Sequence, residues 1–463
     1  PEMRFTGSAA TKPATCSGVI TNSPSGLRQS LATLARNLFG ATPAEWHSGA
    51  TMTERRRVWR MVGQGKAQLV IGARSALFLP YRNLGLIIVD EEHDTSYKQE
   101  DGVLYNARDM AVLRAAMCSA QVVLASATPS LESWVNAASG KYARLDLRSR
   151  YGEAELPDMA AIDLRAEEMP AGRWISPTLE GAVKTRLARG EQSLLFLNRR
   201  GYAPLTLCRH CGYRFQCPNC TAWMVEHRLT HRLACHHCGH VIPAPRRCPE
   251  CKEEDSLVAC GPGVERIADE VKALWPQART AIATSDTLWS PARAAEFVKS
   301  VEGGDVDIII GTQLVTKGYH FPNLTLVGVI DADLGLEGGD LRAAERTFQQ
   351  VMQVAGRAGR GEKPGHVFIQ TRMPESEVIQ ALVDADPERF YAVETENRRR
   401  ANAPPFGRFA AIIISSEDAD EAAQTARLIG KSAPVIEGMR VYGPAPAPLA
   451  VLRGRHRHRL LIH

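Results

Sequence analysis

The sequence contains no long hydrophobic run, and this absence excludes a large class of proteins. Nowhere in its 463 residues do about 18 apolar side chains follow one another, the length that a membrane-spanning helix needs. The N-terminal Pro1-Glu2-Met3-Arg4 also lacks the basic and then apolar pattern of a secretory signal peptide. We therefore expect no membrane partner. Because no Met stands first, we also expect the sequence to begin within a longer protein.

A second absence is the phosphate-binding loop G-x-x-x-x-G-K-[ST] of many nucleoside triphosphatases, which occurs nowhere in the chain. Gly63-Gln64-Gly65-Lys66 resembles it only in part. The first glycine is too close, Ala67 replaces the Ser or Thr, and an apolar strand follows where a helix should begin. The net charge of +5 is too small to indicate nucleic acid by itself.

Cysteine is scarce outside one segment. Of eleven cysteines, only Cys16, Cys118 and Cys260 stand alone. The other eight form C-x-x-C pairs, namely Cys208/Cys211, Cys217/Cys220, Cys235/Cys238 and Cys248/Cys251. Disulfides at this density belong to small secreted domains, whereas this chain is large and has no signal peptide. The spacing indicates metal binding in a reducing, cytoplasmic environment.

Eight thiolates can fill two tetrahedral zinc sites. The inner pairs are separated by the 14 residues Thr221–Ala234 and suit a zinc ribbon made by Cys217, Cys220, Cys235 and Cys238. The outer pairs then form a second site from Cys208, Cys211, Cys248 and Cys251. Pairing in simple sequence order is the alternative, and redox or iron–sulfur use of the cysteines is a weaker one. The nearby histidines are expected to lie at the surface.

Apolar strands and helical segments alternate along the chain, which indicates parallel βαβ units. Predicted strands are Leu69–Gly72, Leu86–Val89, Val122–Ala125, Leu194–Leu197, Ile308–Ile310, Leu326–Ile330 and Ala410–Ser415. Predicted helices are Thr178–Arg189, Val264–Trp275, Arg342–Val354, Pro387–Arg400 and Asp420–Lys431. Residues 4–26, rich in small and polar side chains, are expected to be irregular.

These elements divide the chain into four parts. We predict a first α/β unit over residues 1–147, a linker over 148–177, a second α/β unit over 178–373 and a small α+β C-terminal domain over 374–463. Strands 194–197 and 308–310 can share one sheet. The cysteine segment, residues 207–253, is then an insertion in the second unit.

Two motifs follow the strands of the first unit. Asp90-Glu91-Glu92-His93 ends the apolar run Leu86–Val89, and open α/β sheets bind ligands at the carboxyl ends of their strands. This is the Walker B arrangement, in which Asp90 holds Mg²⁺ and Glu91 orients the attacking water. A solvated acidic turn is the alternative. Ser126-Ala127-Thr128-Pro129 ends the next strand.

Two motifs follow the strands of the second unit. In Gly311–Gly318 the Gly-Thr turn exposes backbone N–H groups that can bind phosphate, while Lys317 can serve either DNA or nucleotide. In Gln353–Arg360 the glycines permit close backbone approach. Arg357 and Arg360 are three residues apart and point the same way on a helical turn. A solvated Gly/Arg loop is the alternative.

In this order the four motifs resemble motifs II, III, V and VI of superfamily 2 helicases. With eight cysteines inserted, the chain is similar to the PriA family of replication-restart DNA helicases, also called primosomal protein N′. Further matches are Gly72–Phe78, Asp94–Gln99, Phe196–Gly201 and Lys317–Pro322. The resemblance implies two RecA-like helicase lobes, the first incomplete, a two-zinc insertion in lobe two with the nested pairing, and a C-terminal domain.

The resemblance also implies a function. The family moves 3′ to 5′ on DNA, recognises stalled forks and starts primosome assembly in the bacterial cytoplasm, using ATP with Mg²⁺. Implied partners are forked and single-stranded DNA, primosome proteins, the replicative helicase loader and single-stranded DNA-binding protein. Implied catalytic residues are Asp90, Glu91, His93, Gln353, Arg357 and Arg360. Gly318 joins Asp90, Glu91, Arg357 and Arg360 in binding the nucleotide.

The missing phosphate loop is the main departure from the family. In the family it lies shortly before the Pro-Glu pair that Pro1-Glu2 resembles. Since this loop supplies much of the contact with the nucleotide, we expect this chain alone to hydrolyse ATP poorly or not at all. A non-catalytic, zinc-containing adaptor for DNA or protein is the alternative function. RNA helicases share the motor motifs but lack the eight-cysteine insertion.

Two segments are expected to meet DNA. Asp94–Arg108 resembles the family's aromatic-rich loop, which senses single-stranded DNA, although only Tyr97 and Tyr105 are aromatic here. Stacking on bases and simple packing of these two rings are equal alternatives. Near the C-terminus, four arginines would share one face of an extended strand and could clamp phosphates: Arg453, Arg455, Arg457 and Arg459.

Overall fold

The computed structural model describes most of the chain. The described residues are 16–20, 36–37, 40, 42–99, 102–147, 156–170, 173–198, 205–208, 213, 215, 217–218, 224–227, 232–234, 240–254, 257–260, 263–284, 287–288, 290–312, 321–333, 336, 342–359, 361 and 363–463. They form two compact units, one built mainly on Pro1–Asp146 and the other on Leu147–Thr287, Val301–Leu314 and Phe321–His463. No helix among the described residues is both long and apolar enough to span a membrane.

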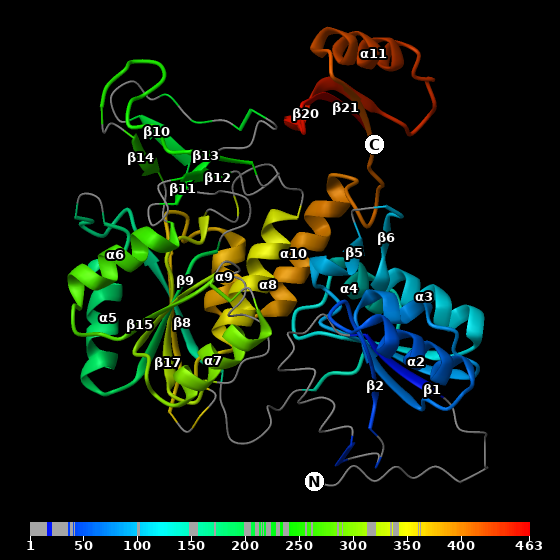
Figure 1. The fold of residues 1–463 in the computed structure, drawn as a ribbon, viewed down its shortest axis with the longest axis horizontal. Helices are drawn as coiled ribbons and strands as arrows, with labels where there is room; N and C mark the ends of the chain where they lie inside the picture. Colours follow the sequence, from blue (N-terminus) through cyan, green and yellow to red (C-terminus); the bar gives the residue numbers. More distant parts are fainter. Residues whose placement is uncertain are drawn as a thin grey trace. The chain divides into compact units, whose positions relative to one another are not determined.

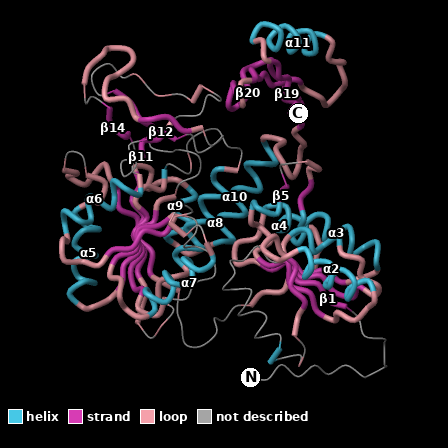
Figure 2. The backbone as a smooth tube through the Cα atoms, in the orientation of Figure 1, coloured by secondary structure: helices cyan, strands magenta, loops and turns pink. Residues whose placement is uncertain are grey.

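The first unit is built on a five-stranded parallel sheet (Figures 1 and 2). Its strand order is β2 (Ala44–Trp46), β3 (Leu69–Gly72), β1 (Cys16–Ile20), β4 (Leu84–Asp90) and β7 (Gln121–Ala125). Its helices are α2 (Met52–Gly63), α3 (Ala107–Cys118) and α4 (Leu131–Ala138), with 3-10 turns η1 (Arg74–Phe78) and η2 (Thr95–Tyr97). Helix α2 buries its apolar side chains against β3, and α3 buries its alanines against β4. These contacts confirm the predicted alternation of strand and helix.

Strand β1 corrects one prediction. Residues 4–26 are expected to be irregular, yet Cys16–Ile20 pairs in parallel with both β3 and β4 at the centre of the sheet. The run Cys-Ser-Gly-Val-Ile has only two β-branched residues and lies among Ser, Thr and Gly, so its local signal is weak. Two neighbouring strands that supply hydrogen bonds on both sides outweigh that weak propensity.

The second unit is built on a six-stranded parallel sheet. Its strand order is β15 (Thr280–Ala283), β16 (Ile308–Gly311), β9 (Gln192–Phe196), β17 (Leu324–Val329), β18 (His366–Thr371) and β8 (Asp158–Asp163). Figure 1 shows α5 (Pro177–Ala188) and α6 (Val264–Leu274) on one face, with α8 (Ala343–Ala355) and α9 (Glu377–Val383) on the other. Helix α7 spans Pro291–Glu302 and follows β15 along the chain, although its residues up to Ser300 group with the first unit. The pairing of β9 with β16 confirms that residues 194–197 and 308–310 share a sheet.

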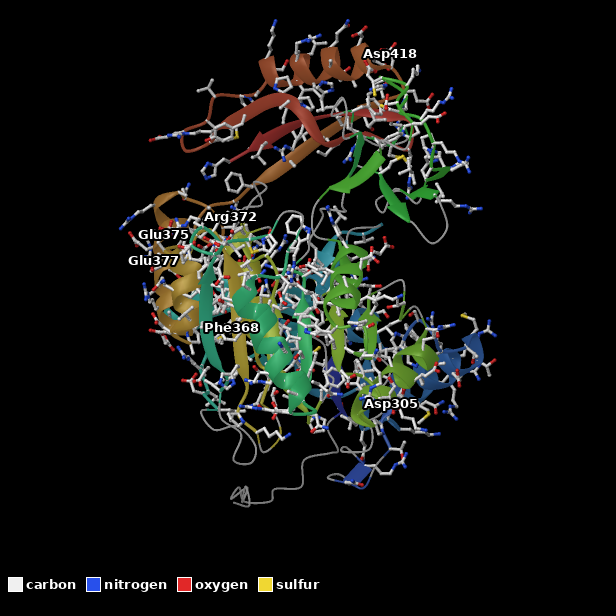
Figure 3. The ribbon with its side chains drawn as sticks, turned by 90° about the vertical axis from the view of Figure 1, so that its left-hand side faces the viewer. Asp305, Phe368, Arg372, Glu375, Glu377 and Asp418 are labelled. Carbon is white, nitrogen blue, oxygen red and sulfur yellow. The ribbon has the colours of Figure 1, made fainter. Side chains whose placement is uncertain are left out.

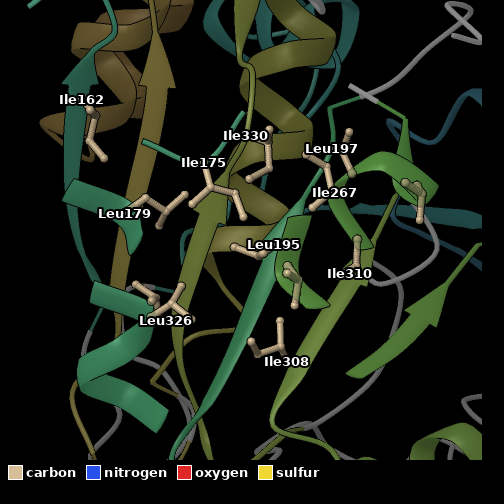
Figure 4. Close-up of a cluster of buried hydrophobic side chains, with 13 residues drawn as sticks. Ile162, Ile175, Leu179, Leu195, Leu197, Ile267, Ile308, Ile310, Leu326 and Ile330 are labelled. Atoms are coloured by element: carbon tan, nitrogen blue, oxygen red, sulfur yellow. The ribbon is translucent and has the colours of Figure 1, made fainter. Parts of the chain in front are cut away.

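The core of this unit lies between its sheet and the helices α5 and α6 (Figure 4). Leu195, Ile308 and Leu326 of the sheet and Leu179 of α5 are all fully buried. Burying one such side chain contributes roughly 1.5–3 kcal/mol. Helix α5 approaches closely because β17 carries Gly328, where an added Cβ would lie 2.8 Å from a Leu179 methyl carbon. Continuous apolar runs in these strands are what a sheet covered on both faces requires.

Two segments lie elsewhere than the sequence predicts. Strand β8 falls in the expected linker, yet it pairs with β18 over its whole length. Helix α9 falls in the expected C-terminal domain, yet it packs against α8 and β8, and Phe390 of α10 (Pro387–Arg400) stacks on Phe348 of α8 at 4.0 Å. Figure 3 shows the turn between β18 and α9, where Glu375 pairs with Arg165 beyond β8. Short segments of mixed polarity such as β8 carry little periodic signal.

The cysteine segment forms small antiparallel sheets. Strands β10 (Leu205–Cys208) and β14 (Leu257–Cys260) pair with each other, so the two ends of the segment meet. Between them lie β11 (Val225–His227), β12 (Arg232–Ala234) and β13 (Val241–Pro243). The segment is therefore an insertion between the second sheet's β9 and α6.

The C-terminal residues form a three-stranded antiparallel sheet and one helix. The strand order is β19 (Ala410–Ser416), β21 (Arg455–Ile462) and β20 (Val441–Leu452). Helix α11 (Ala419–Lys431) begins at Asp418, labelled in Figure 3, whose carboxylate accepts hydrogen bonds from the amides of Asp420 and Glu421. Its buried Ala422 and Ala426 face the sheet, where Leu460 is buried.

Candidate functional site

The acidic motif stands at the carboxyl end of β4. Asp90 is the last residue of the strand, and Glu91 adopts a left-handed backbone with φ 49°, which turns the chain sharply. The amide of Glu92 then donates to the carbonyl of Ala125 at 3.1 Å. The tips of β4 and β7 are thereby tied together, and the acidic motif lies beside Ser126–Pro129.

His93 links the two motifs directly. Its Nδ1 lies 2.7 Å from Ser126 Oγ and 3.5 Å from a carboxylate oxygen of Glu91. Ser126 Oγ also accepts a hydrogen bond from the Thr128 amide at 3.0 Å. The structure thus brings together Asp90, Glu91, His93 and Ser126 from two neighbouring strands.

The charge state of Asp90 depends on its surroundings. Burial raises the pKa of this carboxyl, and a hydrogen bond from the Glu91 backbone opposes the rise. Oxygen ligands of this kind suit Mg²⁺, which usually takes one or two carboxylates and completes its shell with water and phosphate oxygens. Within the described ranges no three His, Cys, Asp or Glu side chains form a ready metal site. Asp90 is an oxygen donor at the strand tip where the sequence predicts Mg²⁺, and its binding of Mg²⁺ stays a prediction.

The two tyrosines after the acidic motif pack into the protein. Tyr97 is fully buried, and its hydroxyl donates to the backbone carbonyl of Asp90 at 2.5 Å. Tyr105 is half-buried and meets Phe78 edge-to-face at 5.2 Å. The exposed tip of this segment carries Val103, 77% exposed, and Leu104, 71% exposed. Of the two alternatives for Tyr97, packing is the one that the structure supports.

The arginine motif follows α8 in the second unit. Gln353 lies in its last turn and Gly356 caps it. Arg357 is buried. Gly359 adopts φ +68°, and a Cβ there would lie 2.6 Å from the Gly365 nitrogen, so only glycine fits this reversal. Arg360 and the Gly318 end of the Gly-Thr motif lie outside the described residues, so their predicted positions are untested.

The cysteines are only partly described. Cys248 is fully buried and Cys217 is 4% exposed, beside Phe215 and Leu233. A tight turn follows Cys248, in which its carbonyl accepts from the Lys252 amide at 3.0 Å. Cys251 is also described, Cys208 is described only in its backbone, and the other predicted ligands lie outside the described ranges: Cys211, Cys220, Cys235 and Cys238. The nested pairing therefore stays a prediction.

The basic C-terminal face is smaller than the sequence predicts. Arg455, Arg457 and Arg459 alternate along β21 and so lie on the sheet face opposite to that of Leu460. Arg453 instead lies in the preceding turn with φ 52°. The expected face of four arginines is therefore one of three.

The structure also shows one buried pair of charged residues that the sequence does not predict. Glu92, the third acidic residue of the motif, is buried with 2% exposure, as is Arg108 with 8%. Burial disfavours the charge of Arg108, but the carboxylates of Glu92 and Asp109 outweigh it and raise the pKa of Arg108. Nothing in the spacing of these residues pairs them, although a third carboxylate directly after a buried strand is a signal that one of them turns inward.

Two family models match parts of the chain. The PriA DNA helicase Cys-rich region domain matches residues 217–243. The primosomal protein N C-terminal domain matches residues 399–463. The second match begins at the end of α10 and includes all three strands of the C-terminal sheet, of which β19 (Ala410–Ser416) is the first.

Curated proteins named replication restart protein PriA match nearly the whole chain. That of Rickettsia felis is 46% identical over 92% of this chain and 65% of its own length. Those of Bacillus subtilis and Haemophilus influenzae are 42% and 39% identical, over 53% and 57% of their lengths. The chain thus spans about half to two thirds of the relatives it matches.

Solved structures give weaker likenesses. RecG bound to a three-way DNA junction is 13% identical with a TM-score of 0.41, covering 80% of this chain and 40% of that one. The helicase MrfA bound to DNA and AMPPNP is 14% identical with a TM-score of 0.44, covering 82% and 44%. At these TM-scores the likeness carries no argument about function.

Proposed function

The chain belongs to the PriA family of replication restart proteins, and on that premise we propose that it carries most of a DNA helicase. The proposed activity is ATP-dependent movement 3′ to 5′ on DNA, recognition of stalled forks and initiation of primosome assembly. The proposed partners are forked and single-stranded DNA, primosome proteins, the replicative helicase loader and single-stranded DNA-binding protein. The proposed location is the bacterial cytoplasm, at replication forks.

One geometric observation carries this proposal. His93 Nδ1 lies 2.7 Å from Ser126 Oγ, which joins the acidic motif of β4 to the motif after β7. A hydrolytic site must be coupled to a nucleic-acid site if hydrolysis is to drive movement, and hydrogen-bond networks between packed elements can carry such coupling. A solvated acidic turn, the alternative for Asp90–His93, would not explain a nearly buried histidine bonded across two strands.

The residues receive roles on this proposal. Asp90 holds Mg²⁺ and Glu91 orients the attacking water. Arg357 and Arg360, with Gln353, neutralise charge that develops on the phosphates, and Gly318 contacts the nucleotide. When bound, ATP with Mg²⁺ supplies the phosphoryl group that is transferred to water. Because G-x-x-x-x-G-K-[ST] is missing from the sequence, we expect weak hydrolysis by this chain alone.

The cysteine segment is proposed to hold two Zn²⁺. Cys217, Cys220, Cys235 and Cys238 form the inner site, and Cys208, Cys211, Cys248 and Cys251 form the outer one. The pairing of β10 with β14 supports the outer site, because it brings the two ends of the segment together. The thiols of Cys217 and Cys248 are buried, and Cys217 lies beside apolar side chains, which suits structural zinc sites closed to solvent.

A fusion experiment tests the helicase proposal. The chain would be joined behind the residues of the Rickettsia felis relative that precede its matched region, with zinc present. We expect DNA-stimulated ATP hydrolysis and 3′ to 5′ unwinding by the fusion, near-background hydrolysis by the chain alone, and loss of both activities in the Asp90→Asn fusion. Strong hydrolysis by the chain alone would refute the argument from the missing loop.

The adaptor alternative gives a different result in the same experiment. A zinc-containing adaptor would bind forked DNA with or without the added residues, yet the fusion would hydrolyse no ATP. DNA binding by fluorescence anisotropy, measured beside hydrolysis, separates the two functions. Absence of DNA binding in both proteins would exclude the helicase and the DNA adaptor together.

A further inference from the structure

We propose that Arg108 is a positioning residue that transmits the state of the β5–β6 hairpin to the acidic motif through Glu92 and Ser130. The hairpin consists of β5 (Lys98–Gln99) and β6 (Tyr105–Asn106). This inference rests on the proposed DNA-driven motor, because it assigns the path by which a DNA contact reaches the hydrolytic residues.

The path consists of one buried hydrogen-bonded network. Arg108 Nη1 donates to Ser130 Oγ at 2.6 Å and to Glu92 Oε2 at 3.3 Å. Glu92 also accepts from the Ser130 amide at 2.6 Å and from the Ser130 hydroxyl at 2.9 Å. Each polar group in the network therefore has a partner, which a buried charge requires.

The network joins three elements at their functional ends. Glu92 follows Glu91 directly at the tip of β4. Ser130 follows the Ser126–Pro129 motif and caps the N-terminus of α4. Arg108 lies in the first turn of α3, next to Asn106, which caps that helix and ends β6. A shift of α3 relative to β4 must therefore change the contacts of both motifs.

The β5 end of the hairpin also contacts the acidic motif. Tyr97, directly before β5, donates to the Asp90 carbonyl at 2.5 Å. The Lys98 carbonyl accepts from Arg74 at 2.8 Å. Between these attachments the tip exposes Val103 and Leu104, apolar side chains that a base can cover. A base that covers the tip would displace the hairpin and so change the contacts of both Tyr97 and Arg108. Of these two residues, Arg108 is the one that is hydrogen-bonded to Ser130.

A purely structural role for Arg108 is the competing explanation. Lysine separates the two roles, because it keeps the positive charge but lacks the planar fork of donors. Arg108 meets both Glu92 and Ser130 through Nη1, while Nε of the same rigid plane donates to Asp109 at 2.8 Å. Asp109 is 56% exposed in its side chain and touches the arginine from outside the network, so Asp109→Asn is the matched control.

The experiment is hydrogen exchange on the full zinc-loaded chain, with and without a single-stranded oligo-dT. In the unsubstituted chain we expect DNA to slow exchange of the amides of residues 126–128, 130 and 131 by about fivefold or more, the lower range of coupling between sites. Arg108→Lys and Glu92→Gln should bind oligo-dT with little change in affinity but lose this slowing. Asp109→Asn should retain it.

Three outcomes would overturn the inference. DNA binding without slower exchange at residues 126–131 refutes it and leaves the proposed function standing. Slowing retained in Arg108→Lys also refutes it, and if circular dichroism shows that this variant is unfolded, Glu92→Gln decides by the same measurement. Failure of the unsubstituted chain to bind oligo-dT instead refutes the proposed function, and the inference falls with it.

Discussion

At the scale of single residues, Gly359 decides whether the arginine motif can turn back against the second sheet. Its φ of +68° costs any L side chain about 1–2 kcal/mol, and a Cβ would also lie 2.6 Å from the Gly365 backbone. Gly359→Ala should therefore lower the unfolding free energy by clearly more than that conformational cost, as measured by urea denaturation.

Gly304 is the matched control for this prediction. It has a similar φ of +78° but no atom within 4 Å of an added Cβ. Gly304→Ala should lower the unfolding free energy only by the conformational cost of about 1–2 kcal/mol. Equal losses in the two variants would show that crowding at Gly359 does not matter.

Asp307 makes the second sheet sensitive to acid. Arg279 donates to this carboxylate through its side chain, at 2.5 and 3.1 Å, and through its amide at 2.8 Å. These bonds lower the pKa of Asp307 below its usual 3.8. Because the folded pKa is lowered, the stabilisation is present above pH 3.8 and disappears as the pH falls through the folded pKa.

Removing this carboxylate should therefore have a pH-dependent effect. Asp307→Asn should lower the melting temperature near pH 7 by about 2 °C or less, as expected for a partly exposed ion pair. The difference from the unsubstituted chain should shrink below pH 4 and vanish in stronger acid. Asp305→Asn removes a neighbouring exposed carboxylate and should give no such pH dependence in the same thermal scans.

At the scale of elements, a buried ion pair joins α8 to α10. Arg398 of α10 donates to Glu394 at 2.7 Å, to Glu345 of α8 at 3.4 Å and to the Pro404 carbonyl at 3.0 Å. Burial raises the pKa of Glu394, and the charge of Arg398 opposes that rise. The arginine thus holds together α8, α10 and the segment that leads to the C-terminal sheet.

Truncating this arginine should cost far more than truncating an exposed one. Arg398→Met leaves the buried Glu394 without its cation and Glu345 with Arg342 at 3.2 Å, and should lower the unfolding free energy by about 3–5 kcal/mol. Arg400→Met removes a pair of the same spacing, Arg400 with Glu396, from an arginine that is 74% exposed and should change little. Comparable losses in urea denaturation would contradict the network.

The basic face of β21 should make the affinity for DNA depend on salt concentration. Arg455→Ala combined with Arg457→Ala should reduce the slope of log affinity for DNA against log salt by about 1–2, since each phosphate contact contributes about 0.9. Arg427→Ala on α11, which covers the opposite face, should leave the slope unchanged. An unchanged slope in the double variant, measured by anisotropy titration, would exclude phosphate contacts by these arginines.

The elements that the sequence predicts correctly share a strong local signal. Strands such as Ile308–Gly311 are continuous apolar runs, and α10 is predicted to the residue. The sequence does not predict the strands β1 and β8 or the domain to which α9 belongs. Their positions depend on pairing and packing with neighbours that are distant in the sequence. The same holds within the site: the His93 motif is readable from its spacing, whereas the contact of Glu92 with Arg108 arises only from tertiary packing.

At the scale of the whole molecule, metal content provides a test that does not depend on ATP. Eight thiolates at four for each ion require about two zinc ions per chain, which elemental analysis of purified protein can count. A strong chelator should remove both zinc ions and unfold the cysteine segment. The parallel sheet of the second unit should persist, because none of its strands contributes a predicted ligand. A content near one zinc would refute the nested assignment.

The pairing of β10 with β14 has a consequence for how the length of the cysteine segment can evolve. Cys208 lies opposite Leu257, so a short turn could join the two strands in place of everything between them. Because the entropy of closing a loop grows only with the logarithm of its length, the parent sheet tolerates almost any length at this position. Recombination could therefore exchange, enlarge or remove the cysteine segment without changing the fold of the domain into which it is inserted.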